Sequence, residues 1–397
     1  MTDPYKGIHP TTATLKNILA SAGVIDPISG EPYTEAMLLG IGGGLGAGYI
    51  LWEFERYESA KVVMGFRNRW NYTVEYMTNA LTRIGVTPNI METSGVKKAE
   101  SNLEDALSKG YAAAAWVDKA HLPYQHLPES MQGHVSHQVT VYSIDSDGVH
   151  VADLSPELYA VPADIFMAAR GRITSDKYRV MTVEPPTSEP DLHAAIRAGI
   201  ADCVEHLGRD SESFALPVYK KWSRLMTNTS NKKGWPVVFK DGHGLYETLR
   251  SIYEGITQDG SDGYGLRGLY ADFLDEAAFI LDAPILEESA RLYRLAADEW
   301  ESLANIALSD DVEAMATTKN LVDARYTLVR NHHDDAAEIN QRLVEFMGEY
   351  NRNCPLDVDA RAVLYEDMQV HLDAIYEAET AALDSLKTAL LEVKESA

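Results

Sequence analysis

The pattern of hydrophobic and polar positions changes near residue 184. Before that point, short apolar runs of strand length alternate with helical patterns, which predicts a mixed α and β region. A first helix is expected to be capped by Thr11 or Thr12 and to end at Gly23, and a second is expected at about residues 34–39. The apolar face of the first helix carries Leu15, Ile18 and Leu19.

Three segments of the first half have the pattern of β-strands. Residues 112–117 form a continuous apolar run, and residues 178–183 read as a further strand. Between them, alternating valines flank the turn at residues 145–148, which has the sequence Asp-Ser-Asp-Gly. This arrangement predicts a β-hairpin from about residue 139 to residue 151.

A proline-rich segment separates the two halves. Residues 184–191 contain three prolines, which favour neither helix nor ladder hydrogen bonds. We therefore predict two domains, residues 1–184 and 185–397, the second wholly helical. From Leu364 onward, apolar residues recur at spacings of three and four, which fits packing within a helical bundle or the seam of a homodimer.

Charge and cysteine content exclude several classes of protein. The chain of 397 residues carries a formal net charge of −25, which disfavours nucleic acid and anionic membranes as partners. Such a balance fits either a halophilic or a mesophilic source. Because no apolar run approaches the length of a membrane span, we expect a soluble, cytoplasmic protein. Cys203 and Cys354 are too isolated to indicate a disulfide framework or a cysteine zinc site.

A glycine-rich run follows the second predicted helix. Residues 40–48 contain six glycines, but they match neither the dinucleotide-binding template nor the phosphate loop, and no lysine follows before Lys61. Two interpretations remain from composition alone. The run is either a flexible helix end or a place where the backbone approaches another group closely.

Several motifs, in this order, resemble the N-terminal papain-like domain of the butirosin biosynthesis protein H family. They are residues 7–15, the glycine run, Val117-Asp118 with Leu122-Pro123-Tyr124, and His137 to Val141 with Val151-Ala152-Asp153. Residues 263–278, followed by Tyr293 and Trp300, resemble the helical domain that usually follows. The resemblance covers about residues 7–310 and implies an α+β fold with a papain-like N-terminal domain.

The resemblance also implies an activity. Family members are acyltransferases that move an aminoacyl or peptidyl group from an acyl carrier protein thioester to an amine, through a cysteine at the start of the first helix. By resemblance His137 is the base, Asp153 orients it, and no cofactor is required. In this chain the cysteine position is Pro10, which has no nucleophilic atom.

Other side chains are candidates for parts of this chemistry. The hydroxyl of Thr11 or Thr12 could replace the thiol, although threonine at a helix start is more often a cap. His134 lies close enough to His137 in sequence to be the base instead. We assign nine residues to a substrate cleft, each with an ordinary structural role as the alternative: His9, Pro10, Gly42, Gly43, Gly44, Asp118, Tyr124, Arg267 and Tyr270.

A basic segment between residues 219 and 240 contrasts with the acidic chain. Such a segment suits docking of an acidic carrier protein, or is a solvated loop. The docking candidates are Lys220, Lys221, Arg224, Lys232 and Lys233. We expect no metal at His332 to Asp335, because acidic helix surfaces bring such residues together by chance.

Two functions follow from these features. The first is transfer or cyclisation of a thioester-bound acyl chain in specialised metabolism, on an acyl carrier protein or a small-molecule thioester. Both a direct transfer without a covalent intermediate and a route through a threonine remain open. The glycine-run amides would then stabilise the oxyanion. The second is a catalytically degenerate relative, or pseudoenzyme, that binds a partner, which the proline at position 10 favours.

Overall fold

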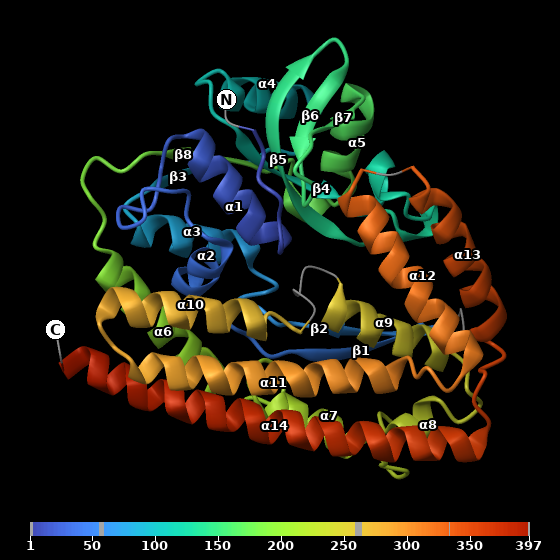
Figure 1. Cartoon of the computed structure of the whole chain (residues 1–397). Coiled ribbons are helices and arrows are strands. Elements are labelled where there is room, and N and C mark those ends of the chain that lie inside the picture. The colour runs from blue at the N-terminus through green and yellow to red at the C-terminus, as the bar shows by residue number, and fades with distance from the viewer. Residues whose placement is uncertain (1–2, 55–58, 259–263, 333, 396–397) are drawn as a thin grey trace. The chain divides into compact units, whose positions relative to one another are not determined.

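A computed structural model of the chain describes residues 3–54, 59–258, 264–332 and 334–395 (Figure 1). The chain forms two compact units, each assembled from three stretches of sequence. The first unit comprises Met1–Leu38, Met77–Leu192 and Ala324–Gln341, and the second comprises Leu39–Tyr76, His193–Asp323 and Arg342–Ala397. The chain crosses between units at residue 192, close to the proline-rich segment, but residues 39–76 and 324–341 depart from the two contiguous domains that we expected.

A six-stranded sheet forms the centre of the first unit, in the order β3-β8-β4-β5-β6-β7 with antiparallel neighbours. The predicted hairpin is confirmed, because β5 and β6 pair and their turn closes with Asp145 opposite Gly148. The strands are β3 (Thr87–Met91), β4 (Ala113–Asp118), β5 (Ser136–Asp145), β6 (Gly148–Ala152), β7 (Tyr159–Val161) and β8 (Val180–Glu184).

Helices cover both faces of this sheet. On one face α1 (Pro10–Ser21) packs against β4, β5 and β8, and the Tyr142 hydroxyl donates to Asn17 Oδ1 over 3.0 Å. On the other face the strand valines form an apolar core with α4 (Val96–Leu107) and α5 (Ala163–Arg172). The unit also contains short 3-10 turns: η2 (Lys119–His121), η3 (Pro123–Gln125), η4 (Glu129–Met131) and η5 (Thr174–Asp176).

The start of α1 differs from the prediction. His9, not a threonine, is the N-cap: it has an extended backbone, and its ring nitrogen Nδ1 accepts from the Thr12 amide over 3.4 Å. Pro10 is the first helical residue, where its fixed φ suits the first turn and its missing N–H leaves no donor unpaired. The threonines therefore lie inside the helix, and neither caps it.

The second unit is mostly helical, as expected for the second half of the chain. α10, α11 and α14 pack side by side (Figure 1), and α12 and α13 each contribute residues to both units. The helices are α6 (Leu192–Leu207), α7 (Pro217–Met226), α8 (Trp235–Val238), α9 (Leu245–Thr257), α10 (Arg267–Leu281), α11 (Ile285–Ala307), α12 (Glu313–Arg330), α13 (Ala336–Tyr350) and α14 (Val358–Glu395).

A hairpin that the sequence did not predict explains why residues 39–76 belong to the second unit. β1 (Tyr49–Phe54) pairs with β2 (Ser59–Met64), and β2 packs on α9, where the Val62 amide donates to Ser251 Oγ over 2.9 Å. Tyr49 is buried and stacks on Trp222 at 4.4 Å between ring centroids. Two further helices, α2 (Glu35–Gly42) and α3 (Thr73–Arg83), each have residues in both units.

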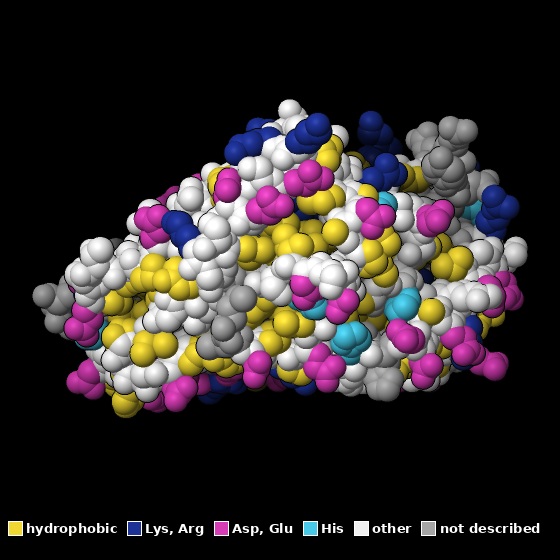
Figure 2. Space-filling model, turned by 90° about the horizontal axis from the view of Figure 1, so that it is seen from above, with side chains coloured by type: hydrophobic (Ala, Val, Ile, Leu, Met, Phe, Trp, Pro, Cys, Tyr) yellow, Lys and Arg dark blue, Asp and Glu magenta, His cyan; other side chains and the backbone are white. Residues whose placement is uncertain are grey.

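The surface reflects the acidic composition of the chain. Acidic side chains are scattered over the face shown in Figure 2, in keeping with the net charge of −25.

In the part of the chain that the structure describes, every helix is too short or too polar to span a membrane.

Candidate active site

The β5–β6 hairpin brings His137 and Asp153 together. His137 lies near the start of β5, and Asp153 directly follows the end of β6. The imidazole Nε2 is 3.0 Å from Asp153 Oδ1 and 2.9 Å from Oδ2, and both side chains are buried. The two residues predicted to act as base and orienting carboxylate therefore form a direct pair.

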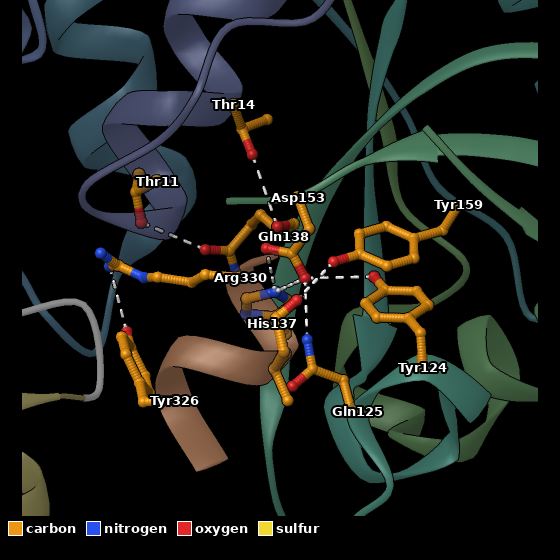
Figure 3. A network of polar contacts seen from close by, with 11 residues as sticks. Thr11, Thr14, Tyr124, Gln125, His137, Gln138, Asp153, Tyr159, Tyr326 and Arg330 are labelled. Carbon is orange, nitrogen blue, oxygen red and sulfur yellow. Dashed lines mark hydrogen bonds and ion pairs between the residues drawn. The ribbon is translucent and has the colours of Figure 1, made fainter. Parts of the chain in front are cut away.

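Two further donors hold Asp153 in place. The Tyr124 hydroxyl and the Gln125 side-chain amide donate to Asp153 Oδ2 over 3.1 and 3.0 Å (Figure 3). Burial by itself raises the pKa of Asp153. The pair with His137, with smaller contributions from Lys119 and Tyr124, outweighs burial and holds this pKa below its usual value. Asp153 is therefore an anion at neutral pH.

This pairing fixes which nitrogen of His137 can act as a base. Because Nε2 faces the carboxylate, the neutral ring carries its proton there and presents an unprotonated Nδ1. Among the described residues, Nδ1 has no hydrogen-bond partner. His134, the alternative base, is exposed on the loop before β5, and its backbone amide bonds to Met131.

The strand that carries His137 is tied to the first turn of α1. Gln138 Oε1 accepts from the Thr11 hydroxyl over 3.1 Å, and the Gln138 carbonyl accepts from the Thr14 hydroxyl over 3.4 Å (Figure 3). Successive side chains on a strand point to opposite faces, so Gln138 faces α1 while the His137 ring turns to Asp153. The link between the pair and the helix start thus runs through the backbone of β5.

A carboxylate that the sequence analysis did not identify lies at the start of α1. Glu35 accepts from the Ile8 amide over 2.8 Å, from the His9 amide over 3.0 Å and from the Thr12 hydroxyl over 2.7 Å. Burial raises the pKa of Glu35, and these three donors oppose that rise. Thr12 is wholly buried in this cluster, whereas Pro10 is partly exposed. No local sequence signal connects Glu35 with α1.

The glycine run makes close packing contacts in the second unit. A Cβ at Gly42 would lie 2.4 Å from the Tyr76 ring, and one at Gly44 would lie 2.6 Å from the Tyr270 ring. Gly43 and Gly44 have φ values of 124° and 67°, so they turn the chain after α2. Their role here is close packing of helices and turns.

The amides of this run are already bonded. The Gly43 amide donates to the Gly40 carbonyl over 3.0 Å and the Gly44 amide to the Leu39 carbonyl over 2.9 Å. The Gly46 amide donates to the Phe66 carbonyl over 2.8 Å. The amides that we expected to stabilise an oxyanion therefore stabilise the turn itself.

Two further cleft candidates lie in the core of the second unit. Arg267 is fully buried and forms an ion pair with Glu379, and it donates to the Gly265 carbonyl over 2.7 Å. Tyr270 is also fully buried, beside Gly44 and Cys203. Burial leaves neither residue a surface that a substrate could reach, so both stabilise the fold instead.

Asp118 and Cys203 are likewise buried, and Cys354 is partly buried. Asp118 ends β4, and its Oδ2 accepts from the Gly133 amide over 2.7 Å. Its Oδ1 has no partner among the described residues. Burial raises the pKa of Cys203 to about 11, and it also raises the pKa of Cys354, so both are protonated thiols at neutral pH.

The basic segment is partly neutralised in the structure. Arg224 pairs with Glu212 and Lys233 pairs with Glu53, while the Lys220 ammonium lies 5.4 Å from the centroid of the Tyr376 ring. Lys221 donates to the Glu212 carbonyl over 3.3 Å, and Lys232 is exposed. The segment therefore presents fewer free cations than its sequence suggests.

In the described parts of the chain, no three His, Cys, Asp or Glu residues lie close enough together to bind a metal ion. His333, one of the residues considered for a metal, lies outside the described residues. Its neighbour His332 packs against the Tyr159 ring at 4.2 Å and lies 3.5 Å from Glu157.

Together, a helix packed on an antiparallel sheet and a His–Asp pair on adjacent strands define an α+β protein with a papain-like N-terminal domain. Residues 9–154 match the family model of butirosin biosynthesis protein H, N-terminal, and residues 166–345 match that of a domain of unknown function (DUF4872). The chain belongs to the butirosin biosynthesis protein H-like family. No curated protein matches the chain. The family indicates a biosynthetic role related to acyl transfer.

Proposed function

We propose that this protein transfers or cyclises an acyl group that arrives as a thioester on an acyl carrier protein or a small thiol. The observation that carries the proposal is the buried His137–Asp153 pair, which leaves Nδ1 of the ring as an unprotonated base. A base of this kind contributes roughly 10²- to 10⁴-fold to a reaction in which a proton moves.

The reaction is a direct transfer. An amine of the acceptor attacks the thioester carbonyl, and His137 Nδ1 takes the proton that the amine loses. The carbon–sulfur bond then breaks, the proton passes to the departing thiolate, and an amide and a free thiol remain. Asp153 stabilises the imidazolium that forms in between. Pro10 takes no part in bond making, so no acyl-enzyme forms.

The hydroxyls of Thr11 and Thr12 supply the alternative route. An acyl group on either oxygen would mark a covalent intermediate. In the structure the Thr11 hydroxyl donates to Gln138 and the Thr12 hydroxyl donates to Glu35. We further propose that the basic segment docks the carrier protein, chiefly through Lys221 and Lys232, whose ammonium groups make no ion pair among the described residues.

Intact mass spectrometry tests the proposal. The protein is incubated with carrier proteins loaded with a panel of acyl groups and with candidate amines. Direct transfer predicts loss of the acyl mass from the carrier, a new amide product and no added mass on the enzyme. An adduct that maps to Thr11 or Thr12 would replace direct transfer with the covalent route.

Pro10 favours one competing function, a non-catalytic binding protein of the same fold. The same panel separates the two functions. Stable binding of a loaded carrier without turnover for any acyl group or amine would support the binding protein and contradict the enzyme.

A further inference from the structure

Residues 324–341 belong to the first unit and contact the backbone of Gln125 and His126. The Gln125 side chain in turn donates to Asp153. Here we call residues 324–341 the return segment. It contains the end of α12 and the start of α13, and it lies more than 170 residues after β6 in sequence. Two of its side chains, Arg325 and Asn340, are buried and bonded to each other, with Arg325 Nε donating to Asn340 Oδ1 over 2.8 Å.

This Arg–Asn pair binds two consecutive carbonyls. Arg325 donates to the Gln125 carbonyl over 3.2 Å, and Asn340 Nδ2 donates to the same carbonyl over 3.4 Å. Asn340 Nδ2 also donates to the His126 carbonyl over 2.6 Å. His126 has a φ of 49°, a conformation that costs free energy for a residue other than glycine. The three hydrogen bonds hold the backbone in this turn.

The turn determines where the Gln125 side chain points. Gln125 is buried, and its amide nitrogen donates to Asp153 Oδ2 over 3.0 Å. A chain of direct hydrogen bonds therefore runs from Asn340 through Gln125 to Asp153 and on to His137.

A second contact of the return segment supports the other donor to Asp153. The Val329 carbonyl accepts from the Tyr159 hydroxyl over 2.6 Å. Tyr159 stacks on Tyr124 with 3.8 Å between ring centroids, and Tyr124 donates to Asp153. Both side chains that support the carboxylate are thus themselves held by the return segment.

We propose that Arg325 and Asn340 are positioning residues for the His137–Asp153 pair and act on it through Gln125. Without the Asn340 donor, the turn at His126 relaxes and the Gln125 amide leaves Asp153. The carboxylate then becomes free to rotate, and the His137 ring is no longer held in one tautomer. The catalytic consequence rests on the proposed function, whereas the effect on the tautomer does not.

Asn340→Asp tests this inference with little change in shape. The substitution removes the donor to the two carbonyls but keeps the oxygen that binds Arg325. ¹⁵N NMR reports the tautomer of His137, whose signals are identified by their loss in His137→Gln. The neutral imidazole of His137 is expected to carry its proton on Nε2 alone in the wild-type protein, and Asn340→Asp is expected to show a mixture of both tautomers. Acyl transfer is expected to fall about tenfold.

Two further variants separate positioning from a general loss of structure. Asn331→Asp, the same change at an exposed site in the return segment, is expected to leave the tautomer and the rate unchanged. Gln125→Met removes the donor to Asp153 directly, leaves Arg325 and Asn340 in place, and should reproduce the effect of Asn340→Asp. Combining the two changes should add little to either alone, because both break one chain of contacts.

The inference is overturned if Gln125→Met, or a folded Asn340→Asp protein, keeps His137 in the wild-type tautomer. Arg325→Lys preserves one donor to the Gln125 carbonyl, so its effect should be smaller than that of Asn340→Asp. If no variant turns over any substrate, wild type included, the proposed function fails. The tautomer measurement still decides the role of Arg325 and Asn340 in that case.

Discussion

At the start of α1, Pro10 keeps the geometry of a nucleophile helix but supplies no nucleophile. It is partly exposed at the first helical position, where a thiol would meet the positive end of the helix dipole. The neighbouring His9 ring caps the helix, and the Glu35 carboxylate accepts from two backbone amides just before it. The helix start is therefore well ordered without a cysteine.

Pro10→Cys is expected to restore a covalent step. A thiol at a helix N-terminus has a lowered pKa and is a better nucleophile than a buried cysteine. After incubation with a loaded carrier protein, mass spectrometry should show that the Pro10→Cys protein has gained the mass of the acyl chain. The wild-type protein should gain no mass. The double variant with His137→Gln should acylate more slowly. A folded Pro10→Cys protein that never gains the acyl mass would contradict this account of the helix start.

Asp153→Asn is expected to destabilise the protein more at neutral pH than in acid. The folded-state pKa of Asp153 lies below its unfolded value, so its charge stabilises the fold above the usual Asp pKa of about 4. This contribution is lost as the pH falls through the folded-state pKa. In urea unfolding, the free energy of unfolding should fall by about 2 kcal/mol at pH 7 and by less near pH 3. An equal loss at both pH values would contradict the direction of the shift.

At the scale of elements, local patterns predicted some structures and missed others. The β5–β6 hairpin was predictable because alternating valines flank a strong turn signal. The β1–β2 hairpin was missed because its strands do not alternate cleanly and follow a run of glycines. The return segment was missed for a different reason: a helical pattern does not say which unit a helix packs against.

The turn after α2 gives a prediction at this scale. Gly44→Ala places a side chain at a φ of 67° and against the Tyr270 ring and Cys203, so it should cost about 3 kcal/mol of unfolding free energy. Gly23 is the matched control. It has a φ of 72°, but a Cβ there meets nothing within 4 Å, so Gly23→Ala should cost only about 1 kcal/mol. If urea unfolding shows that both variants lose the same unfolding free energy, a packing role for Gly44 is contradicted.

Across the whole molecule, the candidate site depends on contacts between residues far apart in sequence. The resemblance to a family and the hairpin pattern identified His137 and Asp153. Nothing in the sequence indicated that Asn340 bonds to the Gln125 carbonyl, because the two residues are 215 positions apart. Such contacts follow from the assembled fold rather than from local propensity, which is why the supports of the pair could not be predicted.

The excess of acidic residues gives a prediction for the whole chain. With a net charge of −25, the excess carboxylates repel one another in the compact fold, and salt screens this repulsion. Raising sodium chloride from about 0.02 M to 0.5 M should therefore raise the melting temperature by several degrees, roughly what 1 kcal/mol produces in a protein of this size. A melting temperature that falls with salt would show that ion pairs outweigh the repulsion.

The most direct test of the central claim compares two His–Asp pairs on the same hairpin. His137 pairs with Asp153 in a buried site, and His150 pairs with Asp145 over 2.8 Å near the exposed turn. The measurement is the rate at which a loaded carrier protein loses its acyl group to an amine. The account predicts a loss of about 100-fold or more in His137→Gln and a rate within about twofold of wild type in His150→Gln. A folded His137→Gln protein that retains the wild-type rate would contradict it.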